Sequence, residues 1–310
     1  MQVRITWLAK FLKAAPIEAM ENIAKIFNIS TESEEYANII REGILTPLQK
    51  PPNKKKRAVE NLRPIILLSV LRKVLATCMI DRTWNKFKNV IPIEQAAYQK
   101  GRSTTEQVFT MKTLAEKAIT SEEYNIFILL LDMSKAFDTV NRGKLMKHLE
   151  DILSESEMRL VYLLISGVKI KVRVGKKCGE EIATNVGVVQ GDCLSAVFFI
   201  FYLAKSIKPL TQITNREDHE DEVMWSALDW LVKKDKLNIE VDPKYSDDMA
   251  FIRSQLAKIN TIKRTIPGIL EADLIENSLI ILIILISIVI ILERLGKGFV
   301  QLSMLKINLT

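Results

Sequence analysis

Apolar and polar positions repeat with two different periods along the chain, and each period predicts a type of secondary structure. Apolar residues recur at helical spacing in four segments, residues 16–27, 65–87, 101–119 and 192–207. A continuous apolar run, residues 126–131, ends at Asp132 and is typical of a strand buried on both faces. Residues 168–184 alternate cationic and apolar side chains around a glycine-containing reversal, which predicts a hairpin.

Three segments depart from this pattern. Residues 50–64 contain prolines and the cationic run Lys54–Arg57, so they are predicted to form a loop. Residues 207–240 combine an acidic stretch with an amphipathic one, which predicts a loop followed by a helix. Residues 279–292 are apolar except for Ser287. They are too few for the roughly 20 that span a bilayer, which favours a buried strand or core helix and no membrane association.

The composition adds a preference for polyanionic partners and narrows the possible chemistry. The chain has 310 residues, is 48% hydrophobic and carries 44 Lys and Arg against 37 Asp and Glu, with a pI near 9.1. Its three cysteines are odd in number and form no C-x-x-C pair, which argues against a disulfide framework and for a reducing, intracellular compartment. With only two histidines, a metal centre is expected to use oxygen ligands.

The stretch KYSDDMAFI, residues 244–252, places two carboxylates side by side between an aromatic residue and an apolar run. Ser-Asp-Asp is ordinary turn chemistry, and a turn without further function is one interpretation. The other is a tight strand-turn-strand in which a cation neutralises Asp247 and Asp248. If its strands neighbour the one ending at Asp132, three carboxylates meet, and two Mg²⁺ ions for in-line displacement at phosphorus need such a ligand set.

The segments that carry these residues resemble the motifs of a known family. LLLDMSKAFDTVN, GVVQGDCLSAVFF and KYSDDMAFI are similar, in this order, to motifs A, B and C of reverse transcriptases of the non-LTR (LINE-type) retrotransposons. Upstream, NLRPIILLSVLRKVLATCMIDR and EQAAYQKGRSTTEQ resemble the finger segments of the same family. The resemblance covers about residues 44 to 277.

This resemblance implies an α+β polymerase right-hand fold, with an antiparallel palm sheet, helices and fingers. The expected domains are an N-terminal region with fingers (1–125), a palm (126–277, with an inserted helical segment about 207–240) and a divergent apolar tail (278–310). The implied activity is RNA-directed DNA polymerase: nucleotidyl transfer from a dNTP to the 3′-hydroxyl of a DNA primer on an RNA template, with two Mg²⁺ ions. An RNA-dependent RNA polymerase shares the aspartate geometry but needs room for a 2′-hydroxyl.

The family's functional residues fall on eight positions of this chain. Asp132 and Asp247 match its principal metal ligands, and Asp248 matches the second aspartate of motif C. Phe137 matches the bulky residue that excludes a ribose 2′-hydroxyl. The alternative interpretation is a core aromatic residue at the end of a strand. The remaining matches are nucleotide contacts: Gln190 and Gly191 of motif B, for which a plain helix cap is the alternative, and the finger cations Arg63 and Lys73, the latter adjacent to Arg72.

The chain also departs from the family pattern. Ala196 stands where motif B normally has Pro, and Ala97–Tyr98 replaces the usual G-F, which we expect to change packing more than chemistry. Motif C is usually Y-A-D-D and has Ser246 here. After Asn277 an Ile/Leu run replaces the family's lysine and L-G turn, so the primer grip and thumb are expected to be absent, as a reading-frame slip near residue 278 would explain. The alternative function is a degenerate, catalytically inactive fragment that at most binds nucleic acid.

Overall fold

The protein is described from a computed structural model that places ten stretches of the chain: residues 12–49, 61–120, 126–133, 135–212, 240–241, 244–246, 248–253, 264–265, 281–288 and 303–304. The chain divides into two compact units. The first comprises residues 1–88 and 140–199, and the second residues 89–139 and 200–310. Each unit therefore combines segments that are distant in sequence. The predicted functional boundaries at residues 125 and 277 stay a prediction.

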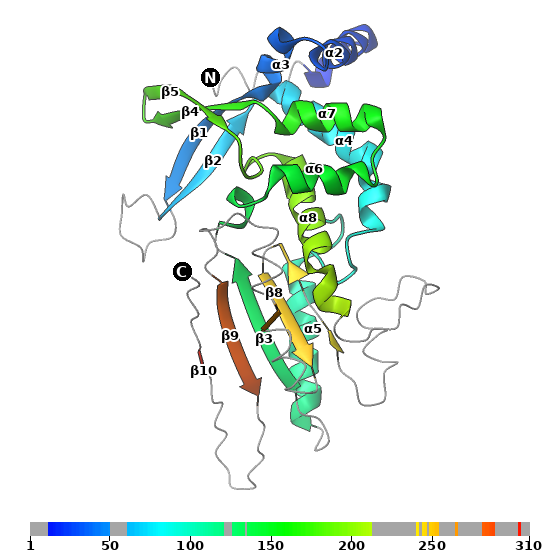
Figure 1. Ribbon diagram of the computed structural model, residues 1–310, viewed down its shortest axis with the longest axis vertical. Helices are drawn as coiled ribbons and strands as arrows, with labels where there is room; N and C mark the ends of the chain where they lie inside the picture. Colours follow the sequence, from blue (N-terminus) through cyan, green and yellow to red (C-terminus); the bar gives the residue numbers. More distant parts are fainter. Residues whose placement is uncertain are drawn as a thin grey trace. The chain divides into compact units, whose positions relative to one another are not determined.

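The first unit contains a mixed four-stranded sheet (Figure 1). Its strand order is β2 (Leu62–Leu68), β1 (Glu42–Gln49), β4 (Val168–Val174) and β5 (Lys177–Thr184). β1 pairs antiparallel with β2 but parallel with β4, and the pair β4–β5 is the hairpin predicted from the alternating cationic and apolar residues. The parallel pairing joins Glu42–Leu45 to Lys169–Val172, so this sheet forms only when distant segments meet.

The described helices that lie wholly within this unit are α2 (Ile17–Ser30), α3 (Glu34–Arg41), α4 (Val70–Lys88), α6 (Arg142–Glu150) and α7 (Glu155–Ile165). Two predictions are wrong here, because strand β2 contains residues 62–64, predicted to belong to a loop, and residues 65–68, predicted to belong to a helix. Ile65 and Ile66 pair with β1, and β-branched side chains fit a strand well. The helix begins after Ser69, whose hydroxyl accepts a hydrogen bond from the main-chain N–H of Arg72 at 3.2 Å, as an N-terminal cap does.

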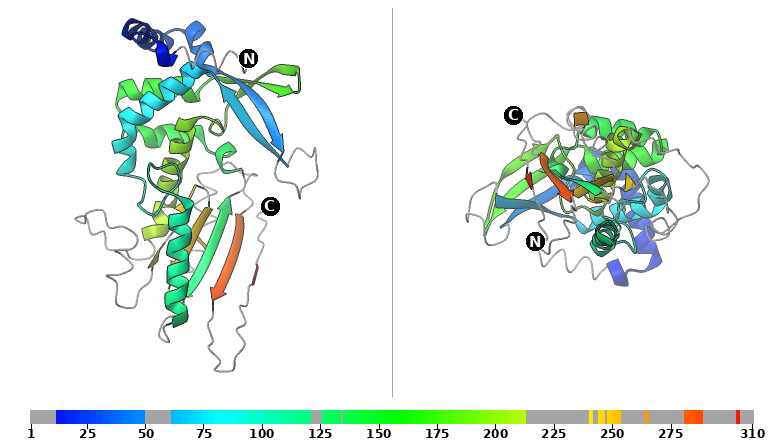
Figure 2. Two further views of the ribbon diagram at one scale, coloured as in Figure 1. Left: turned by 180° about the vertical axis from the view of Figure 1, so that it is seen from behind. Right: turned by 90° about the horizontal axis from the view of Figure 1, so that it is seen from below.

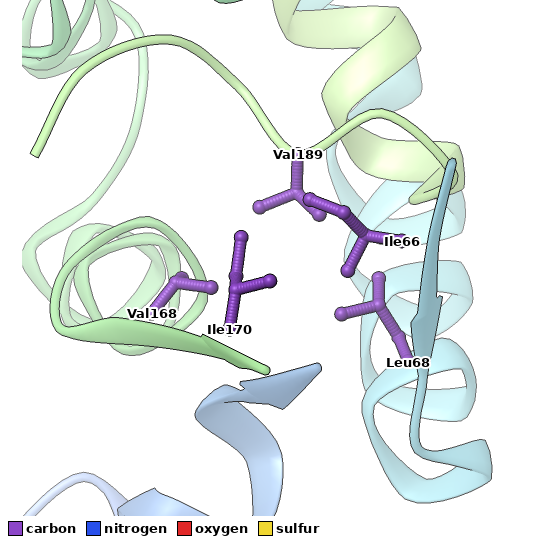
Figure 3. Close-up of a cluster of buried hydrophobic side chains, with 5 residues drawn as sticks. All are labelled: Ile66, Leu68, Val168, Ile170 and Val189. Carbon is purple, nitrogen blue, oxygen red and sulfur yellow. The ribbon is translucent and has the colours of Figure 1, made fainter. Parts of the chain in front are cut away.

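A compact apolar cluster joins this sheet to the segment that precedes α8 (Cys193–Gln212). Its five buried members are Ile66, Leu68, Val168, Ile170 and Val189, drawn together in Figure 3. Val189 comes from the loop directly before the predicted motif B residues, whereas the other four come from β2 and β4. Burial of these side chains therefore fixes that loop against the sheet.

The second unit contains an antiparallel sheet, as predicted for a palm. Its strand order is β10 (Ser303–Met304), β9 (Ile281–Ile288), β3 (Ile126–Met133), β8 (Asp248–Arg253) and β6 (Glu240–Val241), with β7 (Lys244–Tyr245) also paired to β8. Each of these pairings is antiparallel. Helix α5 (Thr104–Thr120) runs alongside β3 and β8 in both Figure 1 and Figure 2. The helix predicted over residues 101–119 is thus confirmed.

The apolar run at residues 279–292 contributes a strand to this sheet. Residues Ile281–Ile288 form β9, which pairs with β3 along its length, so the strand interpretation is confirmed over the described part of the run. Among the residues that the structure describes, no helix is long and apolar enough to cross a membrane. The helix predicted within residues 207–240 lies mostly outside the described residues, since these stop at Gln212 and resume at Glu240.

Candidate active-site elements

Asp132 and Asp248 occupy neighbouring strands of the second unit. β3 and β8 pair antiparallel, and the register runs from Phe127 opposite Arg253 to Leu131 opposite Met249. One further step in the same register brings the positions of Asp132 and Asp248 opposite each other. Cα atoms of directly opposed residues in an antiparallel pair lie about 4.5–5.5 Å apart, so the main chain at these two positions is close.

The remaining geometry of the three carboxylates stays a prediction. Asp247 lies outside the described residues, as do the side chains of Asp132 and Asp248. Within the described part of the chain, no group of three or more His, Cys, Asp or Glu side chains is arranged to hold a metal ion. The main chain nevertheless places Asp132 on a strand flanked on both sides, with β9 opposite β8, and Leu282 of β9 pairs directly with Asp132.

A two-residue reversal connects β7 to β8. Tyr245 pairs with Asp248, which leaves Ser246 and Asp247 between the strands. Ser246 has φ +59°, in the left-handed region that tight hairpins require and that serine seldom adopts. The strand-turn-strand predicted for residues 244–252 is therefore present, and its first turn residue needs support from its surroundings.

That support comes from Gln95, whose side chain is held against the main chain of Ser246. Its amide nitrogen donates to the carbonyl oxygen of Ser246 at 3.1 Å, and its amide oxygen accepts from the N–H of Ser246 at 3.0 Å. The same oxygen accepts from the N–H of Ala97 at 3.1 Å, and Gln95 is only 2% exposed. Main-chain hydrogen bonds between Lys244 and both Glu94 and Ala96 extend this contact.

Tyr98 contacts the same turn and also the aromatic residue of motif A. Its hydroxyl lies 3.3 Å from the Ser246 hydroxyl, a hydrogen bond in which either can donate. Its ring meets Phe137 edge to face, with centroids 6.3 Å apart and planes at 89°. Phe137 is half-buried in a short 3₁₀ turn, η2 (Ala136–Asp138). Ala97–Tyr98 is expected to change packing more than chemistry, and the tyrosine adds one polar contact to the changed packing.

In the first unit, the main chain of Gln190 and Gly191 lies against the main chain of β2. The N–H of Ile66 donates to the carbonyl oxygen of Gln190 at 2.9 Å. Gly191 has φ +115°, and a Cβ added there would lie 2.6 Å from the carbonyl oxygen of Ile66. Glycine is therefore needed at position 191 both for its backbone conformation and for the close approach of β2.

The next residue, Asp192, forms a buried ion pair with Arg72 of α4. Both side chains are 1% exposed, and Nη2 of Arg72 lies 2.8 Å from Oδ2 of Asp192. The guanidinium also donates to the carbonyl oxygens of Leu164 at 2.6 Å and Ile40 at 3.4 Å. The other carboxylate oxygen accepts from the N–H of Leu194 at 3.2 Å, which caps the start of α8. The Asp192 carboxylate thus neutralises the buried Arg72 guanidinium and also caps the first turn of α8.

A second arginine holds the loop that leads to motif B. Arg142, at the start of α6, donates to the carbonyl oxygen of Gly187 at 2.7 Å and of Val186 at 3.2 Å, and also to that of Thr184. Burial, together with the nearby charge of Arg72, lowers the pKa of Arg142 to about 10. The guanidinium stays charged at neutral pH.

The predicted finger cations Arg63 and Lys73 are both exposed. Arg63 lies on β2 and Lys73 on the first turns of α4. Because Arg72 is committed to the ion pair with Asp192, Lys73 is the member of the Arg72–Lys73 pair that remains available to a ligand.

Sequence reasoning did not identify Gln95, Arg142 or the partnership of Arg72 with Asp192. The sequence offers only a glutamine within EQAAYQK, and an aspartate directly after the glycine at the start of an apolar helix. Neither residue belongs to a repeating pattern that would predict its contacts.

Comparisons with known proteins agree with this fold. The family model described as "Reverse transcriptase (RNA-dependent DNA polymerase)" matches residues 52–267, more than two thirds of the chain. Among solved structures, apo telomerase from Candida tropicalis is similar, with a TM-score of 0.53, 14% identity and coverage of 86% of this chain and 48% of that chain. The same telomerase truncated from its C-terminal domain gives a TM-score of 0.49, 15% identity and coverage of 74% and 46%. The chain thus spans just under half the length of these structures.

Proposed function

Because the chain belongs to the reverse transcriptase (RNA-dependent DNA polymerase) family, we propose that it is the RNA-directed DNA polymerase domain of a non-LTR retroelement. The observation that supports the proposal is the β3–β8 register, which pairs Leu131 with Met249, so that Asp132 and Asp248 are the next residues of the two strands. If Asp247 and Asp248 only formed a turn, no third aspartate would be needed on the neighbouring strand β3. The substrates are an RNA template, a DNA primer and dNTPs.

The residues present fit a pair of divalent cations. Carboxylate oxygens are the ligands that Mg²⁺ prefers, and Asp132, Asp247 and Asp248 are proposed to supply them. Bound Mg²⁺ supplies Lewis-acid activation of the primer hydroxyl and neutralises charge on the phosphates. The protein's proposed part is to hold three carboxylates together, and the pairing of β3 with β8 and of β7 with β8 supports this.

The other matched residues are proposed to contact the nucleotide. Gln190 and Gly191 directly precede α8, whose N-terminal region favours contact with a phosphate. The close approach at Gly191 in the structure is that of β2. Exposed Lys73 and Arg63 offer a point charge and a planar fork, respectively, for the triphosphate. Phe137, packed against Tyr98, is proposed to exclude a 2′-hydroxyl and so to select dNTPs over rNTPs.

The direct test is primer extension on an RNA template. Purified protein with Mg²⁺ and dNTPs is expected to extend a DNA primer, whereas Asp247→Asn is expected to reduce the extension rate by more than about 10³-fold, since a metal-binding charge is lost. Binding of the primed RNA, measured by fluorescence anisotropy, is expected to change less than about threefold, because contacts with the nucleic-acid backbone supply most of that affinity.

Two outcomes contradict the proposal. If wild type and Asp247→Asn extend the primer equally, the Asp247 carboxylate has no part in catalysis. Salt-sensitive RNA binding by the wild type without any extension supports the alternative, a chain that binds nucleic acid through its cations and is catalytically inactive.

A further inference from the structure

We propose that Gln95 and Tyr98 are positioning residues that clamp the turn at Ser246, and so fix the aspartates that follow it relative to Phe137. The inference rests on the proposed polymerase function for its consequence, but the clamp itself is a contact that can be measured without catalysis. We call Gln95, Tyr98 and Ser246 the turn clamp. All three lie in the second unit, as do Phe137 and the paired strands β7 and β8.

The Gln95 side chain makes a two-point contact that few residues can make. It engages both the N–H and the carbonyl oxygen of Ser246, at 3.0 and 3.1 Å, so it resists rotation of that residue's main chain. A carboxamide is suited to this because it presents a donor and an acceptor in one plane. Glutamate keeps the acceptor but loses the donor. It also adds a negative charge beside Ser246, the residue that precedes the aspartate pair in the sequence.

The clamp also stabilises an unfavourable backbone conformation. Ser246 has φ +59°, and a residue other than glycine persists there only when its surroundings hold it. Ser246 is 6% exposed and Gln95 2%, so water competes little for these hydrogen bonds. The residue that turns the chain immediately before Asp247 is therefore held from outside its own hairpin.

Tyr98 and Ser246 form a complementary pair of departures from the family pattern. The usual residues at these positions are Phe and Ala, neither with a hydroxyl, and here both carry one. The two hydroxyls lie 3.3 Å apart and bond to each other. A hydroxyl at either position alone loses this partner, so the two substitutions are expected to be energetically coupled.

The Tyr98 ring continues the chain of contacts to Phe137. Edge-to-face packing at 6.3 Å joins the proposed sugar-selecting residue to the tyrosine whose hydroxyl bonds to the turn. Displacement of the turn therefore changes the support of Phe137 as well. The turn clamp is expected to affect turnover and sugar selection together.

The first experiment measures the clamp directly, by hydrogen exchange of the Ser246 amide in the full chain. Gln95→Met keeps the length of the side chain but removes both hydrogen bonds, and it is expected to speed exchange of the Ser246 amide at least tenfold. Gln107→Met is the matched control, because Gln107 is also buried, at 9% exposed, but lies on α5. Unchanged exchange in Gln95→Met overturns the clamp, whether or not the chain polymerises.

The second experiment is a double-mutant cycle with Tyr98→Phe and Ser246→Ala, each of which removes one oxygen atom. Each single variant is expected to lower kcat about three- to tenfold with the KM for dNTP changed less than about twofold, since one hydrogen bond is lost but no substrate contact. The double variant is expected to lose less than the product of the single losses. Each single variant is also expected to incorporate rNTPs more readily relative to dNTPs.

The outcomes separate the two proposals. Losses that multiply without coupling, or kcat changes without any change in sugar selection, overturn the link from the turn to Phe137. Absence of extension by the wild type contradicts the polymerase function but leaves the exchange measurement as a complete test of the clamp.

Discussion

The motif B loop (residues 184–192) and the motif C turn (residues 244–248) are held in place by different chemistry. Arg142 and the Arg72–Asp192 ion pair hold the loop with charged groups, whereas the contacts described at the turn come from the Gln95 amide, the Tyr98 hydroxyl and main-chain atoms. The loop is proposed to bind a polyanion, which is compatible with cations nearby. The turn includes one cation of its own, Lys244, which is 1% exposed and whose main chain bonds to Glu94 and Ala96.

The largest effect on stability is expected from breaking the charged support. Arg72→Met leaves the Asp192 carboxylate buried without its partner, and the free energy of unfolding is expected to fall by about 3–5 kcal/mol. Gln95→Met removes neutral hydrogen bonds and is expected to lower it by about 1–3 kcal/mol. Urea denaturation of both variants measures the difference.

A double variant checks the cause. Arg72→Met with Asp192→Leu removes both buried charges and is expected to recover much of the stability lost by Arg72→Met alone. Arg159→Met, which breaks an exposed pair with Glu155, serves as the control and is expected to change stability little. If Arg72→Met is no more harmful than Gln95→Met, the contrast between loop and turn is wrong.

A glycine substitution tests how tightly the motif B loop is packed. Gly191→Ala introduces a Cβ 2.6 Å from the Ile66 carbonyl oxygen at φ +115°, and it is expected to lower the free energy of unfolding by about 2–3 kcal/mol. Gly175→Ala is the matched control, since Gly175 has φ +63° but nothing within 4 Å of an added Cβ. It is expected to lower stability by about 1 kcal/mol through backbone strain alone. Equal losses in urea denaturation would contradict a packing role for Gly191.

The smallest effect is a difference in acid sensitivity. Burial by itself would raise the pKa of Glu157 in α7, but hydrogen bonds from Lys86 and Ser154 outweigh it and lower the pKa to about 2. Since the folded pKa lies below the ordinary value of 4.5, the stability from this carboxylate is complete above about pH 4.5 and is lost as the pH falls towards about 2. Glu157→Gln is expected to flatten this dependence in unfolding measured between those pH values.

Two variants serve as controls for that titration. Glu155→Gln alters an exposed carboxylate whose pKa is also lowered, first by its hydrogen bond with Arg159, and solvent screening is expected to make its effect smaller. The Gln95 amide does not titrate in this range, so Gln95→Met is expected to lower stability by a similar amount at each pH. A steep pH dependence of the Gln95→Met effect would contradict the neutral character assigned to the turn clamp.

The periodicity of the sequence identified elements whose burial is set locally. The helix at residues 101–119 and the hairpin at 168–184 each have a pattern long enough to exclude the other period, whereas turn chemistry predicted the reversal at 244–252. Residues 65–68 were assigned to the wrong element because a run of four apolar residues fits either type. Pairing of Ile65 and Ile66 with β1 decides the outcome, and no local pattern records that pairing.

The motifs identified the proposed ligands but not the residues that hold them. The expectation that Asp132, Asp247 and Asp248 meet stays a prediction, although β3 and β8 are neighbouring strands as it requires. Gln95 acts on main-chain atoms 151 residues away, and Arg72 on a carboxylate 120 residues away. A single glutamine or arginine forms no repeat, so such long-range contacts emerge only from the folded structure.

The parallel pairing of β1 with β4 has a consequence for how the chain folds during synthesis. Residues 42–45 cannot form their parallel pairing until residues 169–172 have been synthesised. Residues 89–139, which lie between them in the sequence, belong to the other unit. At ordinary translation rates the β1–β2 ribbon therefore emerges from the ribosome several seconds before its sheet can be completed, with one edge unsatisfied. Such a large sequence separation between paired residues favours slow folding, and it leaves this nascent edge open to incorrect pairing during synthesis.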